Sequence, residues 1–481
     1  MAPRRVRVLP LVLALVGLAV AGTALAFRLR ANRDVTTSSE QAYRAYRSGV
    51  ENDLKMYERE AMSSYAEALR YDPHFVMATL RLADKMRGRD PERAASLLAS
   101  AARYRDDLTE REKLMLRIYE ERWGKRDMKV LEALYDEYQK RFPKDPEGFQ
   151  MRAGFLANSG RMPEAIAEYE RLITVNPNYA IAYNTLGYQA ASRGENAKAE
   201  DYLKRYRFLA PNDANPLDSL GELYAFTGRY DEAEENLRKA IAIKEDFYAA
   251  WGHLGSVEAG RGNPVKAAEY FRKASDNAPN TYSRYDFRFL SAMCLVDAGR
   301  PDDAVKDLDA ATAEIAAMAP GVEARKLKVG DAFRRAGLLG RIGRTAEAEA
   351  ALASVDLKEI TDPKEPKSQE MAARQVSLIR GVIAMGAGRD AEAVALLKAS
   401  LEQKQDKGFA SSDYYQNNAY VRLALATSLG RLGRPDEAEK ALAPILEKNP
   451  RFYPALLSLA RARGQAPPAP IASVARAESA S

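Results

Sequence analysis

The amino-acid sequence predicts an all-α fold, a solenoid of about eleven stacked helical pairs. Its 481 residues are 46% hydrophobic and 29% charged, the balance of a globular protein rather than of a disordered, collagen-like or multi-span membrane protein. Three residue types recur at intervals of 34 or 68 positions: Pro177, Pro211 and Pro279; Gly187, Gly221 and Gly255; and Ala199, Ala233 and Ala267. A period of this length indicates one helix–turn–helix unit repeated along the chain.

Each residue type in the period has a place in such a unit. Two antiparallel helices joined by a tight turn cannot bury their own apolar faces, so each pair stacks on the next. Gly221 and Ala233 are small, which lets the paired helices cross closely. Gly228 can adopt the positive φ that ends the first helix, and Pro211 ends a second helix because it lacks an amide donor.

Three consecutive units, 180–213, 214–247 and 248–281, keep this pattern in one register. The last of them shows the full set of pattern residues, namely Trp251, Leu254, Gly255, Gly262, Ala267, Phe271, Ala274 and Pro279. This set resembles the tetratricopeptide repeat (TPR) family. The resemblance implies a right-handed superhelical solenoid that acts as a protein-interaction scaffold. The N-terminal half, about residues 38–281, also resembles the repeat halves of bacterial multidomain regulators.

The repeats suggest the following organisation. A TPR array occupies residues 38–281, and a divergent TPR-like helical array with a capping helix occupies residues 282–463. In the second array, turns that begin with glycine and arginine recur 44 or 45 residues apart, as at Gly299, Gly343, Gly388 and Gly433. We therefore expect longer helices or loops there, with residues 357–373 and 402–418 as the candidate loops. Residues 464–481, rich in Ala, Pro and Ser, predict a disordered tail.

Residues 1–27 form a targeting element. Three arginines precede the apolar stretch 9–27, which as a helix reaches about 28 Å, just enough to cross a bilayer core. Two readings stay open: an uncleaved membrane anchor, or a signal peptide cleaved after Ala26. A polar linker, 28–37, follows. Both readings place the repeats outside the cytoplasm, in a bacterial periplasm, either membrane-anchored or released as a periplasmic or secreted protein.

Charge and motif content argue against nucleic-acid binding and catalysis. The net charge of +6 falls to +1 without the first 34 residues, which leaves no basic stripe for nucleic acid. One cysteine and two histidines offer little for a metal centre, and no phosphate-binding, metalloprotease or hydrolase motif is present. We expect no catalytic residues, no metal and no cofactor. Paired acids such as Glu234 and Glu235 are expected on a solvated surface.

The family resemblance also implies a ligand groove. In this family the first helices of successive repeats line the concave face, chiefly at positions 2, 5, 9 and 12. Position 12 is alanine at Ala191, Ala225 and Ala259, which leaves room for a bound segment. The partner-binding residues implied here are Ile181, Asn184, Tyr188, Asn215, Asp218, Glu222, His253 and Ser256. The carboxylate clamp of chaperone-binding members is absent.

The expected function is therefore a non-catalytic protein–protein interaction scaffold of the cell envelope. Two alternatives stay open. One is an exported repeat module that binds a small ligand or glycan, because tyrosine and asparagine in a groove can contact sugars. The other is an enzyme with its site in the divergent C-terminal half.

The two readings of residues 9–27 predict different outcomes in one fractionation. If the segment stays attached, the protein should remain in membranes washed with alkaline carbonate and should begin at or near Met1. N-terminal sequencing of the membrane and soluble fractions measures this. A soluble form that begins at Phe27 would contradict the anchor.

Overall fold

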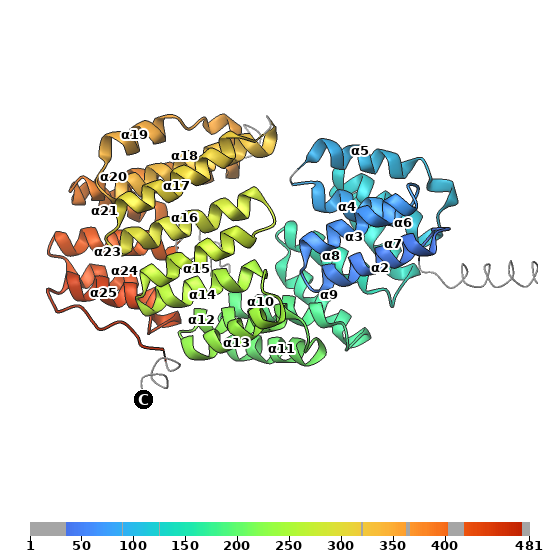
Figure 1. The fold of residues 1–481 in the computed structure, drawn as a ribbon, viewed down its shortest axis with the longest axis horizontal. Helices are drawn as coiled ribbons and strands as arrows, with labels where there is room; N and C mark the ends of the chain where they lie inside the picture. Colours follow the sequence, from blue (N-terminus) through green and yellow to red (C-terminus); the bar gives the residue numbers. More distant parts are fainter. Residues whose placement is uncertain are drawn as a thin grey trace, which may run out of the picture. The chain divides into compact units, whose positions relative to one another are not determined.

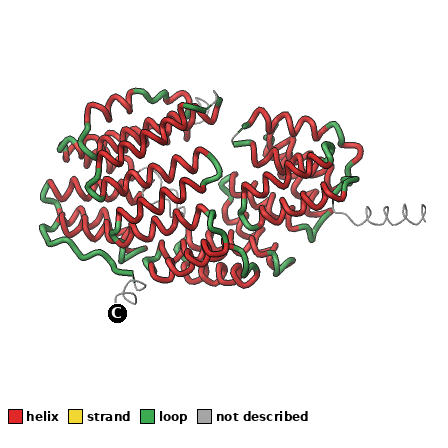
Figure 2. The backbone as a smooth tube through the Cα atoms, viewed as in Figure 1, coloured by secondary structure: helices red, strands yellow, loops and turns green. Residues whose placement is uncertain are grey.

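The computed structural model describes residues 35–88, 90–124, 126–318, 321–361, 366–402 and 418–473, and all regular secondary structure in them is helical (Figures 1 and 2). By packing, the chain divides into two compact units, Met1–Arg152 and Ala153–Ser481. Residues 1–34, with the predicted targeting element and most of the linker, lie outside the described part. No helix in the described residues has the length and apolar character needed to span a membrane.

The first unit is a stack of helical pairs that starts at Ser39. The serine hydroxyl accepts a hydrogen bond from the Ala42 amide and thereby caps the first helix. A capping box, formed by Thr109 and Glu112, begins α6. Its helices are α2 (Glu40–Leu54), α3 (Glu58–Tyr71), α4 (Val76–Met86), α5 (Pro91–Ala102), the short 3₁₀ helix η1 (Arg105–Asp107), α6 (Glu110–Trp123), α7 (Met128–Arg141) and the start of α8 (Pro146–Asn158).

The second unit, taken by itself, is also a stack of antiparallel helical pairs. Its helices are α9 (Met162–Val175), α10 (Ala180–Ser192), α11 (Asn196–Leu209), α12 (Ala214–Phe226), α13 (Tyr230–Ile243), α14 (Tyr248–Arg261), α15 (Pro264–Asn277), α16 (Thr281–Asp297), α17 (Pro301–Ala316), α18 (Val322–Arg341), α19 (Thr345–Ala353), η2 (Leu357–Glu359), α20 (Pro366–Gly386), α21 (Asp390–Glu402), α23 (Asn418–Arg431), α24 (Pro435–Lys448) and α25 (Tyr453–Ala462).

The predicted repeat register is confirmed. Helices α10, α12 and α14 begin at residues 180, 214 and 248, the first positions of the three sharpest units. The described residues contain eleven helical pairs, from α2/α3 to α23/α24, followed by the single helix α25. Gly228 ends the α12–α13 turn with φ +77°, and a Cβ on Gly221 would lie 2.6 Å from Leu237 Cγ. Both glycines thus have the roles that the period assigned to them.

The C-terminal half agrees with the expectation in one respect and differs from it in two. Helices α18 and α20 have 20 and 21 residues, which lengthens the first two of the glycine spacings, from Gly299 to Gly343 and from Gly343 to Gly388. Residues 366–373, expected in a loop, open α20, whereas residues 403–417 lie outside the described part. Helices α15 and α16 pack directly on each other, so the stack continues across residue 281, where the sequence pattern weakens.

The tail also differs from the expected disorder as far as it is described. Residues 464–473 have no regular secondary structure, yet the Ile471 amide donates to the Arg261 carbonyl at 2.9 Å. Residues 474–481 lie outside the described part. The tail therefore contacts the repeats instead of leaving them.

The second unit folds back on itself, which brings its last helices to its early repeats. Asn449, in the α24–α25 turn, donates from Nδ2 to the Tyr230 hydroxyl at 3.0 Å and to the Ala225 carbonyl at 3.2 Å. Arg451 Nη1 donates to the Gly228 carbonyl at 3.3 Å. Helices α14 and α25 are also in contact. These contacts join residues more than two hundred positions apart and close the stack between α12 and α25.

The fold-back predicts which helices are destabilised by a substitution in the core. Leu220→Ala removes a buried side chain and should cost about 2–5 kcal/mol, whereas Gly221→Leu should overpack the crossing and cost about 1–3 kcal/mol. Hydrogen exchange should accelerate in α10–α15 and also in α24–α25, with α18–α21 nearly unchanged. Equal acceleration over the whole unit would contradict the repeat-by-repeat packing.

Candidate functional site

The predicted groove residues lie on three successive first helices, α10, α12 and α14. Four of them meet in one cluster: Tyr188, Asp218, Glu222 and His253. The Tyr188 hydroxyl donates to Glu222 Oε2 at 2.5 Å, and His253 Nδ1 lies 2.7 Å from Asp218 Oδ1. His253 Nε2 is 3.7 Å from Glu222 Oε1. The imidazole therefore bridges the two carboxylates of α12.

This cluster is far more enclosed than the sequence pattern implied. Asp218 and Glu222 are 2% and 5% exposed, and the His253 side chain keeps 16%. Burial raises the pKa of Asp218, while the charge and hydrogen bond of His253 limit that rise. Burial alone would lower the pKa of His253, but the charges of Asp218 and Glu222 outweigh it and raise the pKa to about 9. His253 is accordingly protonated at neutral pH and neutralises one of the two acids.

The other predicted groove residues are engaged separately. Asn215 is buried and donates to the Tyr206 hydroxyl at 2.9 Å. The Ser256 hydroxyl donates to the Gly252 carbonyl of its own helix at 3.3 Å. Asn184 is buried, and its Oδ1 has no hydrogen-bond partner among the residues that the structure describes; Ile181 is half-buried. The structure thus uses most of these side chains to join helices, and leaves Ile181, Tyr188, His253 and Ser256 as the partly exposed members.

A second candidate surface, which the sequence reasoning missed, is a cleft of about 620 Å³ inside the folded-back stack. First helices α14, α16, α18, α20, α23 and α25 contribute to its wall. Small residues make room for it: Ala259, Ala424, Ala426, Gly430 and Ala462. Ala259 is one of the position-12 alanines that predicted space for a bound segment. The other walls come from the C-terminal repeats, where no groove was predicted.

The lining of the cleft is part apolar and part polar. Leu423 and Leu457 lie among its apolar residues, and three arginines, which we call its basic rim, also line it. Arg341 pairs with Asp297, and Arg431 donates to the Met385 carbonyl at 2.9 Å. Arg461 is exposed and forms no ion pair with any residue of the described ranges. Such a rim favours a ligand that carries an acidic group.

No arrangement for metal or cofactor chemistry is found in the described residues. No group of three His, Cys, Asp or Glu side chains in the described ranges could hold a metal ion. Cys294 is fully buried in α16, among the apolar residues of the core.

Comparison with known proteins agrees with the repeat register. The profile of the tetratricopeptide repeat family matches residues 156–214, 219–282 and 423–466, so it also covers the α23–α25 wall of the cleft. Protein FlbA of Caulobacter vibrioides is 24% identical over 196 residues, which are 41% of this chain and 31% of FlbA. A TPR repeat-containing protein of Dictyostelium discoideum is 37% identical over 68 residues, 14% of this chain and 26% of that protein.

The chain thus spans less than a third of the length of either relative. Among solved structures, a tetratricopeptide repeat protein from Parabacteroides merdae is similar with a TM-score of 0.41 and 14% identity, over 66% of this chain and 98% of that one.

The bridging histidine predicts a pH-dependent stability. A pKa of about 9 in the folded state, above the usual 6.5, means that the His253 contribution is complete below about pH 6.5 and is lost as the pH rises through 9. Between pH 6.5 and 9.5 the free energy of unfolding should fall by about 1–3 kcal/mol more in the native protein than in His253→Gln.

Trp251, on the same helix, reports this unfolding by fluorescence if Trp123 is replaced by phenylalanine. Urea midpoints at the two pH values give the free energies. An equal loss of stability in both proteins would show that His253 is not protonated in the folded state.

Proposed function

Because this chain is a tetratricopeptide repeat protein, a member of a family whose fold generally serves protein interaction without catalysis, we propose that it is a non-catalytic scaffold that holds a segment of a protein partner on its concave side. The observation that carries the proposal is the cleft of about 620 Å³. Its volume lies in the range of pockets that bind ligands, and helices from six repeats face it.

The chemistry of the cleft indicates the kind of segment. Small side chains leave space, leucines offer apolar contact, and Arg461 adds an exposed charge without a described counter-ion. We propose a partner segment with apolar side chains and at least one acidic group. Interface energy concentrates on a few aromatic or arginine anchors, which makes Arg461 the first candidate for such an anchor.

The predicted groove on α10, α12 and α14 stays part of the proposal as a second contact surface. Its partly exposed residues, Ile181, Tyr188, His253 and Ser256, are available to a partner, whereas the buried Asp218 and Glu222 act mainly as the support beneath them. A binding role for the buried members would act through their effect on His253.

We also propose that the protein works at a bacterial cell envelope, with residues 9–27 as membrane anchor or export signal. The support for this location is the sequence of that segment, three arginines followed by nineteen residues of mainly apolar character. The repeats would then meet their partner outside the cytoplasm.

Photo-crosslinking in the native cell tests the binding surface. The photoreactive residue p-benzoylphenylalanine would replace Leu457 in the cleft, Ile181 in the predicted groove, or Arg380, which is exposed on α20 and does not line the cleft. We expect covalent adducts with another polypeptide from position 457. Adducts from position 181 alone would move the partner to the α10–α14 groove, and adducts only from position 380 would contradict a concave binding surface.

Charge reversal then tests the partner's chemistry. Arg461→Glu should lower the adduct yield from position 457, or the affinity of the identified partner, at least about tenfold, which corresponds to ~1.4 kcal/mol. The matched control is Arg380→Glu, which changes the same charge away from the cleft. Equal effects of the two substitutions would show that net charge, and not the rim of the cleft, determines binding.

A further inference from the structure

The described C-terminal segment, residues 464–473, runs in extended form from the end of α25 back to α13 and α14. Two hydrogen bonds hold its far end. The Ile471 amide donates to the Arg261 carbonyl at 2.9 Å, and the Ser473 hydroxyl donates to Glu234 Oε2 at 3.0 Å. Ser473 is only 6% exposed. A serine eleven residues beyond the last helix is therefore as enclosed as a core residue.

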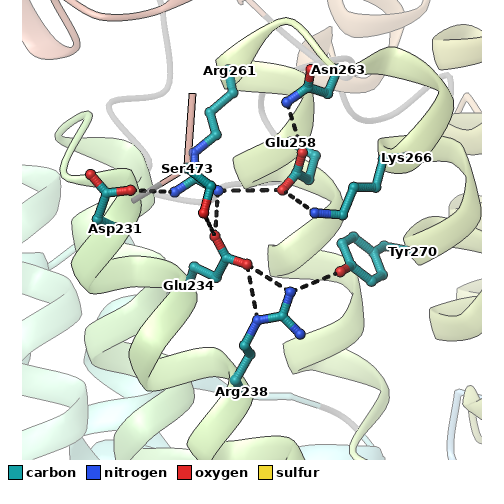
Figure 3. A network of polar contacts seen from close by, with 9 residues as sticks. All are labelled: Asp231, Glu234, Arg238, Glu258, Arg261, Asn263, Lys266, Tyr270 and Ser473. Carbon is teal, nitrogen blue, oxygen red and sulfur yellow. Dashed lines mark hydrogen bonds and ion pairs between the residues drawn. The ribbon is translucent and has the colours of Figure 1, made fainter. Parts of the chain in front are cut away.

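The site that receives Ser473 is built around a fully buried arginine (Figure 3). Arg261 has no exposed surface and reaches three carboxylates. Its Nη2 lies 2.7 Å from Asp231, and its Nη1 lies 2.6 Å from Glu234 and 3.3 Å from Glu258. Because Asp231 and Glu234 lie on α13 and the other two on α14, the guanidinium joins the two helices.

Glu234 is the member that the segment contacts directly. Besides Arg261 it pairs with Arg238, at 2.6 Å. Burial alone would raise the pKa of Glu234, but the hydrogen bonds from Arg261 and Arg238 outweigh it and lower the pKa to about 2. The carboxylate stays ionised and offers Ser473 a charged acceptor, which forms a stronger hydrogen bond than a neutral one. The expectation of a solvated Glu234 is thus wrong, because its neighbours on α14 and the segment cover it.

On the far side of the network, Glu258 is bound in the same way. Lys266 Nζ lies 2.8 Å from Glu258 Oε1, and Asn263 Nδ2 donates to Oε2 at 2.9 Å. Figure 3 shows that these residues and Arg238, whose Nη2 lies 3.2 Å from the Tyr270 hydroxyl, surround the Arg261 guanidinium. The acceptor for Ser473 is consequently held in place before the segment docks.

Because of its composition, the segment loses little conformational entropy when it docks. Three of its ten residues are prolines, Pro467, Pro468 and Pro470, all immediately before the bonded part. Proline fixes φ near −65° and favours extended geometry in the residue before it, so the undocked segment already has few conformations to lose. Covalent attachment to α25 also raises its effective concentration at the site.

The two ends of the segment meet opposite walls of the cleft. It leaves α25 just after Arg461 and Ala462, which line the cleft, and it is fixed to the carbonyl of Arg261, the residue next to Gly262 of the α14 wall. The segment therefore spans from the last helix of the array to the helix on which the array folds back.

We propose that residues 464–473 are an intramolecular strap, bound at a site on α13 and α14, which holds α25 against α14 and thereby controls access to the cleft. The site recognises an extended, proline-rich segment that presents a backbone amide and, two residues later, a hydroxyl group. The control of partner access rests on the proposed function, whereas the strap itself does not.

Hydrogen exchange of the full-length protein, without a partner, tests the strap. Ile471→Pro removes the amide donor, and Ser473→Ala removes the hydroxyl donor. The matched control is Ala469→Pro, which adds a proline at an exposed position of the same segment. Ser473→Thr keeps the hydroxyl and should restore protection.

Both disrupting variants should accelerate exchange at least about fivefold in residues 449–463 and 225–234. Ser473→Ala loses the hydrogen bond to the charged Glu234, and Ile471→Pro loses the bond to the Arg261 carbonyl and displaces Ser473. Unchanged exchange in Ile471→Pro and Ser473→Ala would overturn the strap, and so would an equal acceleration in Ala469→Pro.

The gating role has a separate readout. With p-benzoylphenylalanine at position 457, Ile471→Pro should raise the adduct yield severalfold over Ala469→Pro. Faster exchange without a higher yield would overturn the control of access and leave the strap intact. If the unmodified protein gives no adducts at any concave position, the proposed function fails while the exchange result still decides the strap.

Discussion

Every helical pair in this chain has an apolar face that only a neighbouring pair can cover, and the rest of the structure depends on this requirement. Close crossings such as that of Gly221 with Leu237 bring the two helices of a pair together, and each pair then packs on the next. Such a stack has an uncovered face at each end. In the second unit the C-terminal end is covered by the array itself, since α25 packs on α14 and Asn449 bonds to the α12–α13 turn.

The fold-back also explains why the site is formed from distant parts of the sequence. The cleft needs α14 on one side and α23 and α25 on the other, and these walls meet only because the repeats between them turn the stack back. Polar contacts at the seam are few but well placed. The Asn449 amide and the Arg451 guanidinium donate to backbone carbonyls at the end of α12 and in the turn that follows it.

The sequence predicted the local features of this structure well and the distant ones poorly. Starts at residues 180, 214 and 248, the positive φ of Gly228 and the proximity of Asp218 to His253 all follow from a period that acts over some 34 residues. The burial of Asp218 and Glu222 did not follow from this period, because it depends on the hydrogen bond by which Tyr188 of α10 reaches across to Glu222 of α12. Neither the cleft nor the bond from Ser473 to Glu234 could be predicted, because both depend on small rotations summed over six repeats. The sequence of a single repeat does not determine the sum of these rotations.

One consequence of the closing contacts concerns mechanics and linkage. An open solenoid behaves as a spring, whose ends move apart at little cost because no single contact opposes them. Joining α25 to α12 and α14 converts this part of the array into a ring, and widening its interior must then strain or break the seam. Any ligand that needs a wider interior is bound in competition with the seam, and by thermodynamic reciprocity whatever loosens the seam tightens the ligand by the same factor. Asn449, which is buried in the seam and is not among the residues that line the cleft, would then influence affinity through the seam.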